Sequence, residues 1–227
     1  MNRNKNFTSV KKLAGAGIFA ALAIAVSFVT SFLKIGYLSL DAGDVIIVLA
    51  SFIYGPGTGV AISLISSMAS FMYSGTMWWG AFMDFVSSAV FAFTASFIYS
   101  WFKTFNSAII GIYASVIAVT AVMMPLNILI TPLYMPVTVE FVLHEIPRML
   151  LPFNFAKALF NGGIALMLYK PLVRALRSSG FAAEGYSAKS SSDVTFFGIP
   201  KNTFITLVVG GTSVLLATAG LIILTFV

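Results

Sequence analysis

The chain has 227 residues, of which 59% are hydrophobic and only 9% are charged, whereas about a quarter of the residues in soluble domains are charged. This composition indicates an integral membrane protein with several spans and no large soluble domain. The absence of cysteine excludes disulfides, zinc–thiolate sites and thiol nucleophiles. The net charge of +6 comes mostly from basic residues beside apolar segments, which is a topology signal rather than a nucleic-acid-binding surface.

A basic N-terminal tail, residues 1–12, precedes an apolar run from Leu13 to Leu33 that is long enough to span a bilayer. A signal peptide also starts in this way, but no small-residue cleavage pattern closes the run, so we expect a retained helix. Within it Gly17, Ala21 and Ala25 fall four residues apart and share one face. Such a small-residue stripe lets another helix approach closely, either within this subunit or from a partner membrane subunit.

Two shorter helices are expected next. The mixed segment Lys34–Gly43 is expected to be a loop, and Asp44 stands where a carboxylate caps a helix at Val45–Tyr54. The turn Gly55–Gly59 lacks the preceding strand and the following Lys-Ser/Thr of a phosphate-binding loop, which excludes nucleotide binding there. A third, serine-rich helix is predicted at Gly59–Tyr73, followed by a loop at Ser74–Thr76.

Four further apolar segments complete the pattern. Helices are predicted at Gly80–Trp101, at Ala108–Ile130 and, because proline suits a first helical turn, at Pro152–Tyr169. Between the last two, Thr131–Met149 contains three prolines and is expected to be a loop without a regular helix throughout. A cytoplasmic polar linker at residues 173–202 leads to a seventh apolar helix at Thr203–Val227.

The basic residues predict an orientation in the membrane. With the N-terminus in the cytoplasm, ten of the 13 basic residues lie in inside segments, only Lys34 and Arg148 lie outside, and Lys157 lies within a span. Because cytoplasmic loops are enriched in lysine and arginine, this bias favours a cytoplasmic N-terminus. Asp84, Asn127, Asn154 and Lys157 are then expected in the outer half of the membrane.

The polar residues inside these apolar segments point to a binding site. Asn154, Lys157 and Asn161 are spaced by three and four residues and share one helix face. Lys157 alone is consistent with an ammonium that extends to the outer interface. Asn127 and Asn154, however, offer donors and acceptors that lipid cannot satisfy, which favours a site for a small polar solute.

Asp84 is open to three interpretations from the sequence. It suits a counter-ion of Lys157, an acceptor for the solute, or a carboxylate near the start of a helix. His144-Glu145 does not begin a zinc-protease motif, because Arg148 stands where the second histidine is required and the chain has no other histidine. No serine triad is present either, so we expect neither a metal site nor an enzyme.

Taken together, these residues resemble the substrate-binding S components of energy-coupling-factor (ECF) vitamin transporters, specifically the riboflavin-specific kind. The resemblance covers about Leu13–Leu172. It rests on the small-residue stripe and on four motifs: Leu40-Asp41-Ala42-Gly43-Asp44, Phe52-Ile53-Tyr54-Gly55-Pro56, Asn127 followed by Pro132-Leu133-Tyr134, and Pro152-Phe153-Asn154-x-x-Lys157.

The resemblance implies an all-α, six-helix subunit of the cell membrane that binds one vitamin from outside and needs no cofactor. The seventh helix is an addition that this pattern does not require. The stripe Gly17/Ala21/Ala25 is expected to meet an energising transmembrane subunit driven by two cytoplasmic ATPases. Asn127, Asn154 and Lys157 correspond to the family's riboflavin contacts, and the loop around Leu38–Asp44, with Leu40, is expected to close over the ligand. The further candidate contacts are Tyr134, Asn161 and Asp84, the last of which departs from the less acidic position that the family leads us to expect.

Two other interpretations remain open at this stage. The chain fits an S component for another vitamin or precursor. It also fits a membrane scaffold whose polar residues only hold the helices together.

Overall fold

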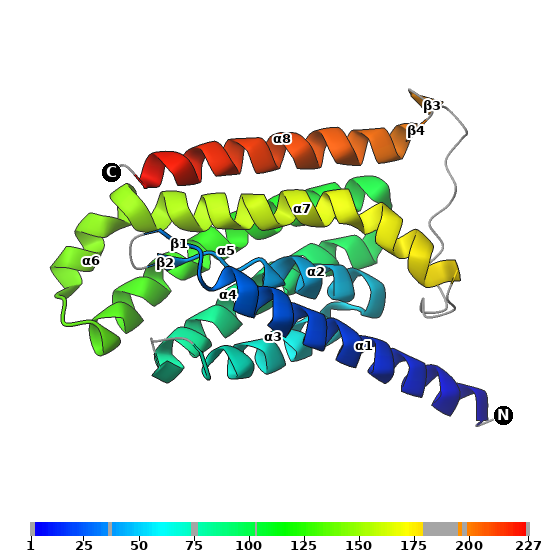
Figure 1. The fold of residues 1–227 in the computed structure, drawn as a ribbon, viewed down its shortest axis with the longest axis horizontal. Coiled ribbons are helices and arrows are strands. Elements are labelled where there is room, and N and C mark those ends of the chain that lie inside the picture. The colour runs from blue at the N-terminus through cyan, green and yellow to red at the C-terminus, as the bar shows by residue number, and fades with distance from the viewer. Residues whose placement is uncertain are drawn as a thin grey trace.

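The computed structural model describes the whole chain except residues 1–2, 36–37, 74–76, 103, 179–194, 197–198 and 226–227. The predicted loop at Ser74–Thr76 therefore lies outside the described residues. The elements, in chain order, are α1 (Arg3–Thr30), β1 (Lys34–Ile35), β2 (Leu38–Ser39), α2 (Gly43–Tyr54), α3 (Pro56–Ser70), α4 (Met77–Phe102), α5 (Phe105–Tyr134), α6 (Val139–Glu145), the π-helix η1 (Ile146–Leu150), α7 (Leu151–Ser178), β3 (Thr195–Phe196), β4 (Ile199–Pro200) and α8 (Lys201–Leu224) (Figure 1).

The fold is an all-helical membrane bundle, as the sequence predicts. Within the described ranges, five segments are long and apolar enough to cross a bilayer: Val10–Thr30, Trp78–Phe102, Asn106–Tyr134, Val139–Leu172 and Thr203–Leu224. The helices α2 and α3 have 12 and 15 residues, fewer than the roughly 20 that a full span needs. With these two, all seven predicted main helices are found in the predicted order.

The join between α2 and α3 is a sharp turn at Gly55. Its φ of 98° lies in a region that side chains with a Cβ rarely adopt, so glycine is favoured here. The next residue, Pro56, occupies the first turn of α3, where its missing N–H leaves no helical hydrogen bond unmade. This turn lets both short helices fold back into the bundle.

The short helix α2 lies at the centre of the bundle, packed against α1, α3, α4 and α7. All but one of its residues are buried. In Figure 1, α1 and α8 lie on opposite sides of this core, with α1 packed on α2 and α3 and α8 packed on α7. Small residues bring the helices close: a Cβ on Gly111 of α5 would come within 2.5 Å of the Ala95 carbonyl oxygen of α4. Close backbone contact of this kind is typical of membrane helices.

The prediction that Thr131–Met149 is a loop was wrong. The helix α5 continues to Tyr134 through Pro125 and Pro132, since membrane bundles tolerate prolines within helices. After a short bend, Thr138 caps α6 by accepting a hydrogen bond from the Phe141 N–H at 3.2 Å. Pro147 falls in the first turn of η1, where a missing N–H costs little.

The prediction that Asp44 caps α2 was also wrong. The N-cap residue is Ala42, with no side-chain cap hydrogen bond, and Asp44 lies buried within the first turn. The Gly43 N–H at the start of α2 instead donates to Oδ1 of Asp41 at 2.7 Å. Because Asp41 takes this role, Asp44 is free to face the interior of the bundle.

Other helix ends differ from the predicted ones by several residues. The helix α1 begins at Arg3 and α7 extends to Ser178, so parts of the predicted N-terminal tail and of the linker are helical. The predicted first loop contains the antiparallel pair β1–β2, in which Lys34 faces Ser39.

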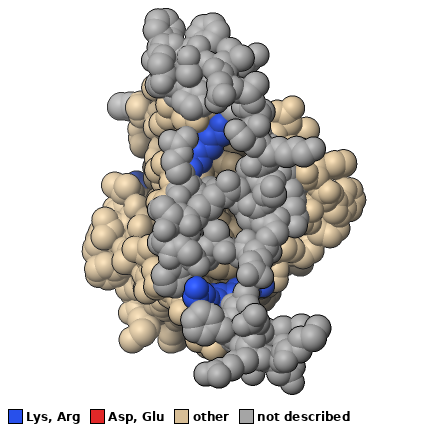
Figure 2. Space-filling view, turned by 90° about the vertical axis from the view of Figure 1, so that its right-hand side faces the viewer, with Lys and Arg blue, Asp and Glu red and all other residues tan. Residues whose placement is uncertain are grey.

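One end of the bundle is basic. The end that holds the N-terminus and the last turns of α7 carries Lys11, Lys12 and Lys170. Figure 2 faces this end and shows Lys and Arg side chains, with no Asp or Glu among the described residues in view. The opposite end holds β1, β2, α6 and the C-terminus of α8 (Figure 1).

Candidate functional site

The polar face of α7 lies in the interior of the bundle. Asn154, Lys157 and Asn161 follow directly after the π-helix η1, and their exposed fractions are 6%, 9% and 0%. Segments of π-helix are frequent at functional sites because they change which face a helix presents. A lysine and two amides buried within a membrane bundle need partners, since unpaired polar groups there are costly.

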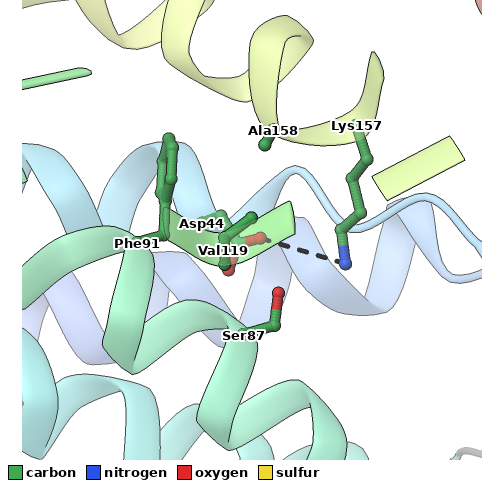
Figure 3. Close-up of a pocket in the computed structure, with 6 residues that line it drawn as sticks. All are labelled: Asp44, Ser87, Phe91, Val119, Lys157 and Ala158. Carbon is green, nitrogen blue, oxygen red and sulfur yellow. Dashed lines mark ion pairs between the residues drawn. The ribbon is translucent and has the colours of Figure 1, made fainter. Parts of the chain in front are cut away.

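The nearest charged partner of Lys157 is Asp44. Its ammonium nitrogen lies 3.9 Å from Oδ2 of Asp44, and Figure 3 shows the two side chains pointing toward each other from α7 and α2. This separation makes an ion pair but no direct hydrogen bond, and no described residue accepts one from Lys157. The donors of Lys157 are thus available to a ligand.

Asp44 itself is held by two further side chains. The Ser88 hydroxyl of α4 donates to its Oδ1, and the Asn161 amide of α7 donates to its Oδ2 at 3.3 Å. The carboxylate therefore joins α2, α4 and α7. Sequence reasoning missed this role because the partners of Asp44 are distant in the sequence, and no local spacing reveals them.

Asn161 also fixes the segment that leads into α2. Its amide donates to the backbone carbonyl of Asp41 at 2.7 Å, while the Ser27 hydroxyl of α1 donates to Oδ1 of Asp41 at 2.7 Å. We refer to Leu38–Asp44 as the entrance segment. Oδ1 of Asn161 is buried, and no described residue donates to it. A buried oxygen that accepts no hydrogen bond from the protein is suited to accept one from a bound ligand.

Acidic side chains outnumber basic ones around Lys157. Asp41 and Asp84 both interact electrostatically with its ammonium, in addition to Asp44. Asp84 is half-buried in the second turn of α4. The predicted role of Asp84 as counter-ion of Lys157 is therefore shared with Asp41 and Asp44, and Asp44 forms the ion pair at 3.9 Å.

Asn127 and Asn154 each bond to a backbone carbonyl one turn earlier in the chain. The Asn127 amide donates to the Met123 carbonyl at 2.7 Å, and its Oδ1 accepts from the Thr131 hydroxyl at 3.3 Å. The Asn154 amide donates to the Leu150 carbonyl at 2.8 Å. Because each carbonyl lies only four residues before its amide, the amides can exchange these bonds for a ligand without moving any distant element.

The remaining predicted contacts lie on two apolar clusters. Leu40 is buried in the entrance segment and clusters with Phe153 and Ala156 of α7. Tyr134 packs against another cluster, formed by Met83, Met123 and Ile130 of α4 and α5. The structure thus gathers Leu40, Asn154, Lys157 and Asn161 around α7, while Asn127 and Tyr134 belong to α5.

A small cavity adjoins the Lys157–Asp44 pair. Figure 3 shows its lining, which consists of Asp44, Ser87, Phe91, Val119, Lys157 and Ala158. Its volume of about 10 Å³ is enough for about one water molecule, whereas pockets for organic ligands have about 300 Å³ or more. Binding of a vitamin-sized molecule therefore requires displacement of lining side chains or of the entrance segment. The described residues contain no group of three metal-ligating side chains in reach of one ion.

The small-residue stripe of α1 faces outward. Gly17, Ala21 and Ala25 are exposed, and a Cβ on Gly17 would meet no atom within 4 Å. The residues of α1 that pack against the bundle include Phe19, Ala20 and Ala23 instead. The stripe is thus not used for packing within the subunit and is free for lipid or a partner helix.

Comparisons with known proteins agree on one family. A family model described as "ECF transporter, substrate-specific component" matches residues 11–173. The chain is 29% identical over 192 residues to the riboflavin transporter RibU of Staphylococcus aureus (strain TCH60), covering 78% of this chain and 95% of that protein. It is 25% identical over 186 residues to the riboflavin transporter FmnP of Bacillus subtilis (strain 168), with coverages of 75% and 97%. A solved structure, "Structure and mechanism of the S component of a bacterial ECF transporter", matches with a TM-score of 0.62 and 30% identity over 74% of this chain and 99% of that chain.

Proposed function

The chain belongs to the family of substrate-specific components of ECF transporters, and we propose that it captures riboflavin and delivers it through an ATP-driven ECF complex. A component of this family is a non-enzymatic, multi-pass membrane subunit that associates with an ECF energising module. The substrate, the contacts, the orientation and the docking surface are our proposals.

The observation that carries the proposal is the buried polar face Asn154/Lys157/Asn161 opposite Asp44. A bundle that served only as a scaffold would gain little from a lysine that is ion-paired at 3.9 Å but makes no hydrogen bond. The two named relatives, both called riboflavin transporters, make riboflavin the first choice among vitamins.

The chemistry of riboflavin suits these side chains. The flat ring has an imide edge of alternating acceptors and a donor, which the amides of Asn127 and Asn154 complement. The hydroxylated tail can accept hydrogen bonds from Lys157 and donate one to the unused Oδ1 of Asn161. Leu40 and Tyr134 supply apolar and aromatic surface for the ring, and Asp84 is an additional acceptor.

Access requires movement, because the cavity at Lys157 holds about one water. The entrance segment is the element we propose to move. Leu38–Ala42 of this segment is held by the strand pair β1–β2, by the apolar contacts of Leu40 and by hydrogen bonds of Leu40 to Leu33, of Asp41 to Ser27 and Asn161, and of Ala42 to Thr30. Asp44, at the end of the segment, is anchored separately by Ser88, Asn161 and Lys157. Movement of Leu38–Ala42 breaks local bonds but leaves the packed helices in place.

We place the N-terminus in the cytoplasm and the entrance segment outside, since the basic end of the bundle (Figure 2) matches the preference of lysine and arginine for the cytoplasmic side. The energising transmembrane subunit then docks on Gly17/Ala21/Ala25, where close helix approach is possible, and two cytoplasmic ATPases drive it. Residues 13–172 form the binding domain and residues 173–202 a cytoplasmic linker.

The test is a thermal-unfolding panel on the purified full-length chain. We expect riboflavin to raise the unfolding temperature, and folate, pantothenate, biotin and thiamine to leave it unchanged. Stabilisation by one of the other vitamins would reassign the substrate within the family. No stabilisation by any small solute would favour the scaffold interpretation.

A further inference from the structure

The helix α8 is an addition to the family's shared bundle. The family model ends at residue 173, whereas α8 begins at Lys201. It packs along α7, the helix that carries the polar face (Figure 1). An element that covers the site-bearing helix is positioned to act on the site.

Two contacts fix the middle of α8 on the bundle. Gly163 of α7 and Gly210 of α8 meet so closely that a Cβ on either would lie 2.8 or 2.6 Å from the other's carbonyl oxygen. The hydroxyls of Ser213 and Tyr113 of α5 are hydrogen-bonded at 2.8 Å. These contacts hold the middle of α8 closely against α7 and α5, because small residues let helix backbones approach each other.

The C-terminal end of α8 shares an apolar cluster with the entrance segment. Leu221, only 7% exposed, belongs to one apolar cluster with Leu40 of the entrance segment and with Phe153 and Ala156 of α7. The half-buried side chains packed against this cluster are Ile35, Leu38, Phe160 and Leu224. We call these eight residues the outer cluster. It joins the site's entrance, the start of α7 and the end of α8.

The two faces of α7 are adjacent at this level. Phe153, Ala156 and Phe160 lie on the outer-cluster face of α7. Each is followed directly in the sequence by one residue of the polar face: Asn154, Lys157 and Asn161 in turn. One position is about 100° around a helix. The outer cluster therefore includes Leu40 of the entrance segment and the same turns of α7 that carry the polar face.

We propose that the end of α8 holds the entrance segment against α7, so that Leu221 and Leu224 act as positioning residues that set how long a bound solute is retained. Leu40 is the one predicted ligand contact among the eight residues of the outer cluster, so we expect Leu221 and Leu224 to act on the opening and closing of the entrance segment. The proposal rests on the proposed function for its ligand, but the movement of the segment can be measured without one.

The ligand-free test uses cysteine labelling, since the chain contains no cysteine. A single cysteine is introduced as Ser39→Cys, at a half-buried position of β2, and its maleimide-labelling rate is measured in the full-length chain. We expect Leu221→Ala to raise this rate about tenfold, because the segment opens more often. Leu215→Ala, at a position 70% exposed on the same helix, is the matched control and leaves the rate unchanged. Lys34→Cys, which is already exposed, should be labelled equally in all backgrounds.

The second test measures riboflavin dissociation by recovery of its fluorescence. Leu221→Ala is expected to raise the dissociation rate about tenfold with a smaller change in association, and Leu221→Met, which keeps the bulk, should restore it. Equal Ser39→Cys labelling in the Leu221→Ala and Leu215→Ala backgrounds would overturn the proposal, even if riboflavin binds. Faster labelling in a chain that binds no riboflavin would support the role of α8 and contradict the proposed substrate instead.

Discussion

Removal of the Lys157 charge tests whether the buried pair is a structural or a ligand-binding feature. We consider Lys157→Met, Asp44→Asn and the double variant, because methionine and asparagine keep the shape of the replaced side chains. At 3.9 Å and an effective dielectric constant of about 20, the attraction between the two charges is roughly 4 kcal/mol. Removal of one partner of a buried pair costs a similar amount, about 3–5 kcal/mol.

Each single variant should therefore unfold at a lower temperature than the parent chain. The double variant should recover most of the loss, since no charge of the pair is left without its partner. Lys12→Met, at an exposed lysine near the N-terminus, is the control and should change nothing.

Riboflavin affinity should behave differently. Loss of a charge-assisted hydrogen bond costs about 1.5–3 kcal/mol, which corresponds to roughly 10- to 150-fold weaker binding. Because this loss comes from the missing ammonium, the double variant should bind as weakly as Lys157→Met although its stability has recovered. The assays are thermal unfolding and riboflavin fluorescence quenching on the same preparations. A double variant with parental affinity would refute the role of Lys157 as a ligand contact, and unchanged stability of both single variants would refute the ion-pair reasoning.

Three further outcomes are expected. Asn154→Ala should weaken riboflavin binding about tenfold but lower stability by less than about 1 kcal/mol, because its amide bonds only to a backbone carbonyl one turn earlier in the chain. A titration that stays at the parental affinity would contradict this. Gly163→Ala should destabilise the chain by about 1–3 kcal/mol, since its Cβ would lie 2.8 Å from a carbonyl oxygen of α8. The control Gly211→Ala, whose Cβ would meet no atom within 4 Å, should be neutral or slightly stabilising. Equal melting temperatures of the two variants would argue against tight packing of α8. Ala21→Trp should abolish vitamin uptake by cells while leaving riboflavin binding intact. The control Ala121→Trp, at an exposed position of α5, should affect neither uptake nor binding. Loss of riboflavin binding in Ala21→Trp would indicate that the stripe packs within this subunit.

Periodicity and composition were sufficient to predict the main helices and the polar face of α7. Long apolar runs predicted the main helices because a bilayer demands them. The shared face of Asn154, Lys157 and Asn161 followed from helical spacing alone. The outward orientation of Gly17, Ala21 and Ala25 was not determined by spacing, since a small-residue stripe suits internal packing equally well.

The errors arose where local rules had competing explanations. The prolines between residues 131 and 149 predict breaks in the helix, but Thr138 followed by Glu140 is a helix-start signal that favours α6. Local sequence rules predict a helix cap at Asp44, because its partners Ser88, Asn161 and Lys157 come from helices that are distant in the sequence. A contact of that kind depends on how the helices pack, and no single sequence reveals it.

The absorption spectrum of the purified full-length chain tests the central claim most directly. The protein is incubated with excess riboflavin, separated from free vitamin by gel filtration, and scanned beside the Lys157→Met/Asp44→Asn double variant. We predict visible flavin absorption that co-elutes with the parent chain at about one flavin per protein and is largely lost from the folded double variant. A colourless parent chain, or equal flavin on both proteins, would contradict a riboflavin site at Lys157.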